Sequence, residues 1–424
     1  METSPVRGMR DFLPEEAKFR DEVIQKIKDC FERFGFMPLE TPAIERWEIL
    51  AAKKAGGSEI LKETYSFKDK GGRKVGLRYD LTVPLARVIA NNPNLPLPFK
   101  RYQIQPVWRY GDVARGRLRQ FLQCDVDIVG SESMLADAEV ISCASFTLKE
   151  IGIKDFLIRI NNRKILSSLV RRAGIRKEKV LDVLRTVDKL DKIGEEGVRE
   201  ELEKKIGKKA DDVMEIVSYK GKEVLEEIGK KLEGWKEGIV GIEELEKLGS
   251  YLEMMGVKNF VFDMSLARGL DYYTGPIFEI EVGEKIGSIA GGGRYDELIG
   301  IFSGRNLPAT GISLGIERIV EILKPKVKLK KSVVKVYVAY IGNVLDYVLK
   351  VVMLLRETGM KCDFDVKGRS LSKQLEYASK MEIPFVVIIG EKEKNEECVK
   401  IRDMATGREE MVKFSELGKW MERI

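Results

Sequence analysis

Guanidinium groups are concentrated in one short stretch of the chain, residues 107–127, which contains Arg109, Arg115, Arg117 and Arg119. These side chains stay charged at physiological pH, and each can hold two oxygens of a phosphate or carboxylate in one plane. The stretch is therefore a candidate anion site. A salt-bridged sheet face would account for the same arginines, and the residues alone support the two interpretations equally.

Further polar residues follow in the same stretch with the spacing of one strand face. The pattern predicts a strand, a glycine-containing loop and a second strand, and alternate residues of a strand point to the same side. Burying polar groups is costly unless each is paired, so this face is predicted to line a polar site. The residues expected on the face of the second strand are Arg117, Arg119, Gln123, Asp125 and Asp127.

Three other segments combine a guanidinium group with aromatic residues or glycines. Arg268 precedes Tyr272 and Tyr273, and with the glutamates of the next predicted strand it would form a polar pocket wall, although a structural arginine fits as well. The glycines of residues 291–293 would either let the backbone approach a ligand or form a tight turn. Arg318 falls in the first turns of a predicted helix, where an ordinary surface arginine is the alternative.

The sequence contains no histidine, and this excludes several mechanisms. A Ser-His-Asp triad, a Cys-His pair and a histidine-bound metal are all impossible, so any general base must be a carboxylate, lysine, tyrosine or the substrate. The cysteines are widely spaced without a C-x-x-C pair, which argues against a disulfide framework and a structural zinc site. Neither a P-loop nor a strand-linked G-x-G-x-x-G fingerprint is present. Electrostatic chemistry by arginines and carboxylates remains.

The composition predicts a soluble globular protein with room for two or three domains. The chain has 424 residues, of which 44% are hydrophobic and 33% charged. No stretch approaches the roughly 20 apolar residues of a membrane helix, and the first residues lack a secretory signal, which predicts a cytoplasmic location. A net charge of +6 permits a nucleic-acid partner without requiring one. Abundant Lys and Glu with few Gln are typical of thermophile proteins.

The first part of the chain predicts mixed helices and strands that would position these residues. Apolar spacing predicts a helix over residues 15–34. The proline-containing segment 36–42 is predicted to be extended but cannot be an ordinary central strand. Short strands are predicted from about residue 60 to 130, and a helix over residues 133–150.

The rest of the chain shows three changes of pattern. Residues 171–250 are rich in charge and predict a separate helical insertion, whereas residues 259–318 predict strands followed by a helix. The lysine-rich segment 324–332 is predicted to be a linker. Beyond it, alternating strands and helices in residues 333–424 predict an α/β module with a partly parallel sheet and a hairpin around Thr406.

In their order and combination, these motifs resemble the three motifs of a class II aminoacyl-tRNA synthetase. Residues 36–42 are similar to the dimer motif, the arginine-rich loop to motif 2, and residues 311–318 to motif 3. Residues 266–275 and 290–296 are similar to the two signatures of histidyl-tRNA synthetases, of an archaeal or thermophile type. The resemblance covers nearly the whole chain, since residues 333–424 are similar to the family's anticodon-binding domain.

The resemblance implies an α+β fold with a class II catalytic domain, in which helices flank an antiparallel sheet. Residues 1–170 and 251–323 would form this domain, and residues 171–250 the helical insertion. A linker at 324–332 would lead to an α/β anticodon-binding domain at 333–424. A cytoplasmic homodimer without membrane association is also implied.

The implied function is the ligation of L-histidine to tRNA(His). ATP and histidine would give histidyl-adenylate and diphosphate, with Mg²⁺ on the phosphates, and the tRNA would then take the histidyl group and release AMP. The alternatives are a non-catalytic relative, such as the synthetase-like regulatory subunit of ATP phosphoribosyltransferase, or a class II synthetase for another amino acid. The terminal module argues against the first alternative, and the segment from Arg268 to Gly275 argues against the second.

The resemblance also implies residue roles, position by position. Arg109, Arg268 and Arg318 would be catalytic: Arg109 and Arg268 on the α-phosphate, and Arg318 on the γ-phosphate. Fixed cations lower the cost of bringing a carboxylate to a phosphate. No side chain is predicted to bind a metal. ATP would be bound by Arg109, Arg117, Arg119 and Arg318. Histidine would be bound by Asp80, Leu81, Thr82, Arg109, Gln123, Asp127, Arg268, Tyr272 and Tyr273.

Within the histidine site, the imidazole is predicted to lie between Asp127 and Tyr273, and the amino group near Asp80, Thr82 and Gln123. A carboxylate and a phenol that face the two ring nitrogens reject side chains that lack polar atoms, because a buried polar group would be left unpaired. The site is thus predicted to select histidine.

The chain departs from the family pattern at one position of motif 2. A glutamate that receives the adenine amino group usually stands two residues after the motif 2 arginine, and here that position is Gly111. Either Asp112 takes its place through a shifted loop, or backbone groups make the contact.

Overall fold

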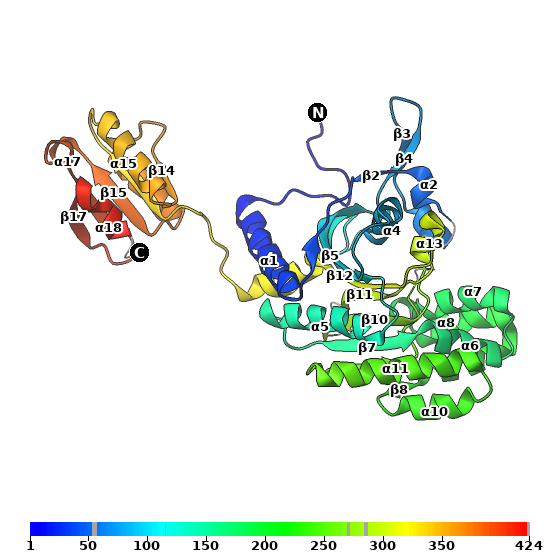
Figure 1. Cartoon of the computed structure of the whole chain (residues 1–424). Coiled ribbons are helices and arrows are strands. Elements are labelled where there is room, and N and C mark those ends of the chain that lie inside the picture. The colour runs from blue at the N-terminus through cyan, green and yellow to red at the C-terminus, as the bar shows by residue number, and fades with distance from the viewer. Residues whose placement is uncertain (53–56, 115, 269–271, 284–286, 422–424) are drawn as a thin grey trace. The chain divides into compact units, whose positions relative to one another are not determined.

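The computed structural model describes the chain except for residues 53–56, 115, 269–271, 284–286 and 422–424. Arg115 and part of the segment from Arg268 to Gly275 therefore lie outside the described residues. The chain divides into two compact units (Figure 1). The first consists of Met1–Asp11 and Glu22–Val327, and the second of Phe12–Asp21 and Lys328–Ile424.

The first unit is built around a mixed, largely antiparallel sheet. Its strands lie in the order β1-β5-β6-β12-β11-β10-β7-β9-β8, and only the pairs β1/β5 and β7/β9 are parallel. This confirms the predicted α+β fold with a central antiparallel sheet. The strands are β1 (Met37–Pro38), β5 (Phe99–Trp108), β6 (Gln120–Val129), β12 (Ala309–Gly315), β11 (Ser288–Arg294), β10 (Pro276–Glu281), β7 (Leu157–Asn162), β9 (Phe260–Asp263) and β8 (Lys220–Gly221).

Helices and a small second sheet accompany this sheet, and of α1 only the residues from Glu22 onward belong to the first unit. The predicted first helix is confirmed as α1, and the predicted helix over 133–150 as α5, which begins with Ser133 as its N-cap. The small sheet has the order β2-β4-β3. Bounds are α1 (Pro14–Arg33), β2 (Ile44–Arg46), α2 (Trp47–Leu50), α3 (Gly57–Lys62), β3 (Ser66–Lys68), β4 (Lys74–Leu77), α4 (Thr82–Asn91), α5 (Met134–Glu150), α13 (Leu298–Ser303) and α14 (Ile316–Leu323).

Between β7 and β9 the described chain is almost entirely helical, as predicted. The helical segment extends beyond residues 171–250 at both ends, from Arg163 to Met254. Val183 and Leu184 belong to the same buried core cluster as Tyr272 and Ile277, so the insertion packs onto the sheet domain. The helices are α6 (Arg163–Arg172), α7 (Lys177–Val187), α8 (Leu190–Ile206), η1 (Gly207–Lys209), α9 (Ala210–Ser218), α10 (Val224–Lys231) and α11 (Lys236–Met254).

The second unit contains its own sheet in the order β14-β13-β15-β16-β17. The pairs of β13 with β14 and β15 are parallel and the remaining pairs antiparallel, which confirms a partly parallel sheet with a hairpin around Thr406. One of its two core clusters includes Val338 and the other Tyr337, its neighbour in the same strand, as expected for a sheet covered on both faces. The elements are η2 (Lys324–Lys326, in the first unit), β13 (Val336–Tyr340), α15 (Leu345–Glu357), β14 (Cys362–Phe364), α16 (Leu371–Lys380), β15 (Phe385–Ile389), α17 (Glu391–Asn395), β16 (Cys398–Asp403), β17 (Glu409–Lys413), η3 (Phe414–Glu416) and α18 (Leu417–Met421).

Two local predictions are settled by the strand bounds. Arg117 and Arg119 precede β6, so the prediction that they lie on the strand with Gln123 is wrong: Arg117 instead closes a bridge with Ala114 within the loop. The glycines 291–293 lie inside β11 rather than in a tight turn. No helix among the described residues is long and apolar enough to cross a membrane.

Candidate active site

A cavity of about 520 Å³ opens on the central sheet of the first unit. It is lined by residues of β6, β12 and β11, of the loop between β5 and β6 (residues 109–119, called the motif 2 loop below), of the segments that contain Asp80 and Arg268, and of the start of α14. The predicted site residues that line it are Asp80, Thr82, Arg109, Arg117, Gln123, Asp127, Arg268, Tyr272, Tyr273 and Arg318. Residues far apart in the sequence are thus brought to one place.

Three carboxylates are buried at one end of this cavity, which we call the acidic end: Asp80, Asp125 and Asp127. Because β6 is unbroken from Gln120 to Val129, Asp125 and Asp127 point to the same side, as predicted. Burial raises the pKa of Asp80 to about 6 and that of Asp125 to about 7. Burial also raises the pKa of Asp127. Excess negative charge in a desolvated place favours a ligand with a cationic or hydrogen-bond donating group.

One buried arginine balances part of this charge. Arg101 on β5 lies directly opposite Asp127, its side chain is fully buried, and its Nη2 lies 2.8 Å from Asp127 Oδ2 and 3.2 Å from Leu81 O. The Tyr295 hydroxyl donates a short hydrogen bond to Asp127 Oδ1. Asp127 is therefore already held by two neighbours. Neither Arg101 nor Tyr295 was a predicted site residue, although the hairpin register and the Gly-Arg-Tyr segment each offered a signal.

Acceptor atoms at the acidic end remain without a hydrogen-bond partner among the described residues. They include Asp80 Oδ2 and Gln123 Oε1. The other oxygen of Asp80 accepts from Val83 N at 3.1 Å, and Gln123 Nε2 donates to Ser313 Oγ at 2.8 Å, so both side chains are fixed. Buried acceptors without partners are costly, and an ammonium group would satisfy them.

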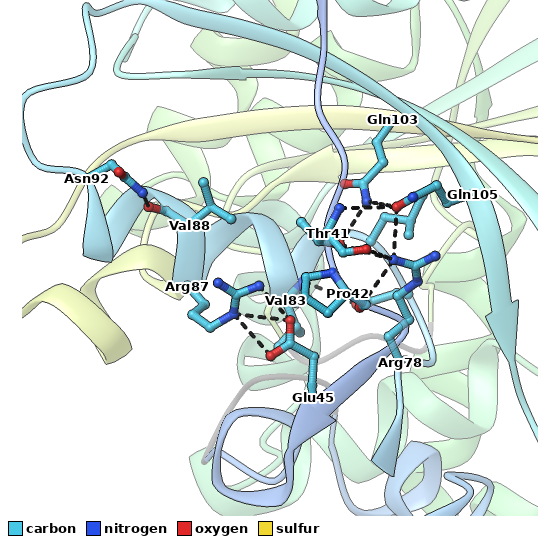
Figure 2. Close-up of polar contacts among 12 residues, drawn as sticks. Thr41, Pro42, Glu45, Arg78, Val83, Arg87, Val88, Asn92, Gln103 and Gln105 are labelled. Carbon is cyan, nitrogen blue, oxygen red and sulfur yellow. Dashed lines mark hydrogen bonds and ion pairs between the residues drawn. The ribbon is translucent and has the colours of Figure 1, made fainter. Parts of the chain in front are cut away.

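A buried arginine also fixes the segment that leads into Asp80. Figure 2 shows Arg78 beside oxygen acceptors of two segments, one with Thr41 and Pro42 and the other with Gln105. Its Nη1 donates to Thr41 O at 2.5 Å and Gln105 Oε1 at 2.9 Å, and its Nε to Pro106 O at 3.0 Å. Since Arg109 Nε also donates to Tyr79 O at 2.8 Å, the backbone on both sides of Tyr79 is tied to β5 and the motif 2 loop.

Guanidinium groups line a further part of the cavity, which we call the arginine end. Arg109 lies with its guanidinium 5.3 Å from the ring centroid of Phe121, and Arg318 Nη1 donates a short hydrogen bond to Ser288 O. Arg117 comes from the loop before β6. Several fixed cations around one space suit a polyphosphate.

Arg268 lies against the glycine-rich strand. Its Nη1 donates to Glu279 Oε2 at 2.8 Å, and its backbone has a positive φ of 49°. A Cβ on Gly291 would lie only 1.8 Å from Arg268 Nη1, and one on Gly311 only 2.0 Å from Asp127 Oδ1. These two glycines therefore leave space for the side chains of Arg268 and Asp127. For residues 291–293, this favours close approach of the backbone over a tight turn.

The helical insertion supplies further charges to the cavity. Arg185 of α7 and Lys192 of α8 line it. Burial raises the pKa of the insertion's Asp188, while the charge of Arg268 opposes that rise, so this carboxylate and Arg268 interact. No sequence motif pointed to these three residues, because helical spacing alone does not show which turn faces a neighbouring domain.

Two predicted residues do not line the cavity. Leu81 is buried, and its carbonyl accepts from Arg101. Arg119 Nε donates to Gly111 O at 3.1 Å, and its guanidinium lies 3.7 Å from the ring centroid of Tyr110, so it braces the motif 2 loop. Their binding roles remain predictions.

One group of carboxylates in the described residues is close enough to hold a cation, formed by Asp191, Glu279 and Glu281. Arg159 Nη1 lies 2.5 Å from Glu281 and 3.4 Å from Asp191, and Arg268 pairs with Glu279. Arginines already neutralise these oxygens, so the group carries no metal assignment.

Comparison with known proteins matches the chain to two family models. Residues 8–319 match the model "Histidyl-tRNA synthetase" and residues 335–424 the model "Anticodon binding domain". The chain is 41% identical to a histidine–tRNA ligase 1 of Bacillus cereus, over 98% of this chain and 97% of that protein. It is also 41% identical to a histidine–tRNA ligase of the archaeon Aeropyrum pernix, over 99% and 98%.

The chain also resembles solved structures of histidyl-tRNA synthetases. The crystal structure of histidyl-tRNA synthetase from Nostoc sp. superposes with a TM-score of 0.83 at 32% identity, over 100% of this chain and 99% of that one. A Bacillus halodurans structure described as ATP phosphoribosyltransferase regulatory subunit/histidyl-tRNA synthetase gives a TM-score of 0.78 at 23% identity, over 92% and 98%. At that identity the second likeness concerns the fold alone.

Proposed function

Because the chain belongs to the histidyl-tRNA synthetase family, we propose that this cavity is where it activates histidine with ATP. The chain is a class II aminoacyl-tRNA synthetase that joins L-histidine to tRNA(His), using ATP and a histidyl-adenylate intermediate. The observation that supports the site is the meeting of a buried acidic end and an arginine end in one cavity. The first suits an ammonium and an imidazole, and the second a triphosphate.

In this proposal both reacting anions, the histidine carboxylate and the α-phosphate of ATP, lie beside Arg109 and Arg268. In the first step a histidine carboxylate oxygen attacks the α-phosphorus, and the bond to diphosphate breaks. Two guanidinium groups spread the charge that this attack concentrates on the phosphoryl oxygens. In the second step the terminal ribose hydroxyl of the tRNA attacks the carbonyl carbon, and AMP leaves. Arg318, at the start of α14, would hold the departing diphosphate.

The finer parts of the proposal concern Mg²⁺, the domains and the assembly. Mg²⁺ takes oxygen ligands, chiefly the ATP phosphates, and would neutralise their charge. Glu317, which lines the cavity beside Arg318 and accepts a hydrogen bond from Leu122 N at 3.2 Å, would be the carboxylate nearest to Arg318 in sequence that could share it. The proposed domains remain those of the sequence prediction.

A homodimer is supported by exposed apolar residues in the dimer motif region, since Met37 is 66% and Ile44 48% exposed. Sedimentation would test the dimer. The function implies a cytoplasmic location.

Histidine-dependent exchange of pyrophosphate into ATP tests the proposed function directly. We expect exchange with histidine and not with other amino acids, followed by charging of tRNA(His). Lack of exchange with histidine would favour a regulatory relative instead.

Gly291→Ala is expected to lower this exchange about 10- to 100-fold, because the new methyl group occupies the place of the Arg268 guanidinium and displaces it by an ångström or more. The obstructing atoms end a flexible side chain, so the free energy of unfolding should change by no more than about 1 kcal/mol. Gly229→Ala on α10, where the nearest atom is 3.6 Å away, is the matched control. Unchanged exchange in Gly291→Ala would remove Arg268 from the proposed mechanism.

The apparent KM for histidine is expected to rise as the pH falls below about 7, since Asp80 and Asp125 must be ionised to hold an ammonium group and have pKa values of about 6 and 7. The imidazole of the substrate titrates in the same range. The measurement is therefore the ratio of KM in the wild type to KM in Asp125→Asn across pH 5.5–8.5. A ratio that does not change with pH would contradict the assignment.

The free energy of unfolding should fall as the pH rises, whereas the affinity for histidine should increase. The folded pKa of both groups lies above the usual 3.8, so between about pH 4 and 7 the folded chain retains protons that the unfolded chain has lost. The contribution of these groups to the free energy of unfolding is thus full below pH 4 and lost as the pH rises through 6 to 7. Asp125→Asn should accordingly raise the melting temperature at pH 8, and not at pH 4.

A further inference from the structure

A carboxylate lies near the arginine end of the cavity. Glu63 follows α3 and lines the cavity with Gly111 and Arg117. Its backbone oxygen accepts a hydrogen bond from Tyr110 N at 2.7 Å, and the ring of Tyr65 packs edge-on against that of Tyr110 with 5.6 Å between centroids. Glu63 is therefore fixed to the motif 2 loop from a different segment of the chain.

The Glu63 carboxylate fills the space in front of Gly111. A Cβ built on Gly111 would lie 3.5 Å from Oε1 and 3.6 Å from Oε2 of Glu63, and 3.4 Å from Arg117 Nη2. A side chain at position 111 would thus point directly at this carboxylate. Asp112, the other acidic residue of the loop, is exposed, whereas Glu63 is half-buried. A partly desolvated acceptor discriminates between ligands more strongly than an exposed one.

The chemistry of a carboxylate limits what it can bind here. It only accepts hydrogen bonds and repels phosphate, so the triphosphate belongs to the arginines. ATP has two kinds of donor, the exocyclic amino group of adenine and the ribose hydroxyls. The amino group distinguishes adenine from guanine, which carries an acceptor oxygen at that position. We infer that Glu63 accepts a hydrogen bond from the adenine amino group and thereby selects ATP, an inference that rests on the proposed function.

The test compares nucleotides that differ by one donor. Exchange is measured with ATP, with purine riboside triphosphate, which lacks the amino group, and with 2′-deoxy-ATP. The wild type should prefer ATP over purine riboside triphosphate by about 10- to 100-fold in kcat/KM, the usual effect of a hydrogen bond to a charged group. Glu63→Ala should lose this factor for ATP alone, so that the two nucleotides become equivalent. The preference of Glu63→Gln for ATP should lie between those of the wild type and Glu63→Ala, because glutamine keeps one acceptor oxygen.

Position 111 offers a rescue. A Cβ at position 111 would make only ordinary contacts of 3.4 Å or more, and Glu63→Ala removes the carboxylate in front of it, so Gly111→Glu in the Glu63→Ala background should restore the preference for ATP. Gly111→Glu alone would bring two carboxylates together and should weaken the use of ATP. Glu48→Ala, on the exposed surface of α2, is the control.

Three outcomes would overturn the inference. One is an unchanged ATP preference in Glu63→Ala. The second is a loss of discrimination against 2′-deoxy-ATP instead, which assigns Glu63 to the ribose. The third is a loss of the base preference in Asp112→Ala and not in Glu63→Ala. Should Glu63→Ala fail to fold, the nucleotide ratios of Glu63→Gln decide. Failure of the proposed function is separate, because wild-type enzyme would then show no histidine-dependent exchange.

Discussion

Arg268→Ala is expected to lower histidine-dependent ATP–pyrophosphate exchange by about 10³-fold, with a smaller effect on the KM for histidine. A fixed guanidinium that stabilises a phosphoryl transition state is commonly worth about 10³-fold or more. Arg268 is pre-positioned for this by Glu279 at 2.8 Å and by the space in front of Gly291. Steady-state exchange at saturating ATP measures the effect.

Two further variants make this result specific. Arg268→Lys keeps the charge but loses the planar pair of donors, so it should recover only part of the rate. Arg171→Ala, on the partly exposed end of α6, should leave exchange within about twofold of wild type, the range of ordinary surface changes. Exchange in Arg268→Ala within threefold of wild type would exclude the residue from catalysis.

Arg101→Met should strongly lower the stability of the first unit. The Arg101–Asp127 pair is 2.8 Å apart, with side chains 0% and 3% exposed. Removing one partner of a buried ion pair costs about 3–5 kcal/mol, because the other charge stays buried and uncompensated. Here Asp80 and Asp125 also feel the charge of Arg101, so loss of the cation affects all three carboxylates. Chemical denaturation at pH 8 would measure the free energy of unfolding.

A double-mutant cycle separates this pair from general damage. Arg101→Met with Asp127→Asn should be less destabilised than the two single changes added together. The exposed pair Arg33–Glu150, at 3.5 Å with side chains 61% and 47% exposed, is the control, and Arg33→Met should cost less than about 1 kcal/mol. Additive effects at Arg101 and Asp127 would show that their charges do not stabilise one another.

The periodic parts of this chain could be predicted from the sequence because they follow from local patterns. α1 and α5 lie within a few residues of their predicted positions, the C-terminal sheet has its predicted hairpin around Thr406, and Gln123, Asp125 and Asp127 share a face because β6 is regular. The loop before β6 could not be predicted in this way. Its course depends on contacts with Gly8, whose carbonyl accepts from Arg119 N, and with Glu63, and neither contact has a local signal.

Site residues that belong to a sequence motif were predicted. Residues that join the site only through tertiary contacts were missed. Arg109, Arg268 and Arg318 do line one cavity, as the motifs implied. Arg101 and Glu63 belong to no motif used in the prediction. Arg101 matters because the hairpin register sets it opposite Asp127, and Glu63 because its carboxylate lies in front of Gly111. Pairings of this kind depend on how separate segments are joined, which spacing alone does not give.

The strand order has a consequence for biosynthesis. β5 and β6 are neighbours in sequence and can pair as soon as residue 129 has left the ribosome, whereas the strand that covers the other edge of β6 begins only at Ala309. Similarly, β7 cannot pair with β9 or β10 until the whole helical insertion has been synthesised. During synthesis, the nascent chain therefore carries an incomplete sheet with open edges through most of translation, and such edges invite wrong pairing. Early packing of the insertion helices on their own would shorten this exposure.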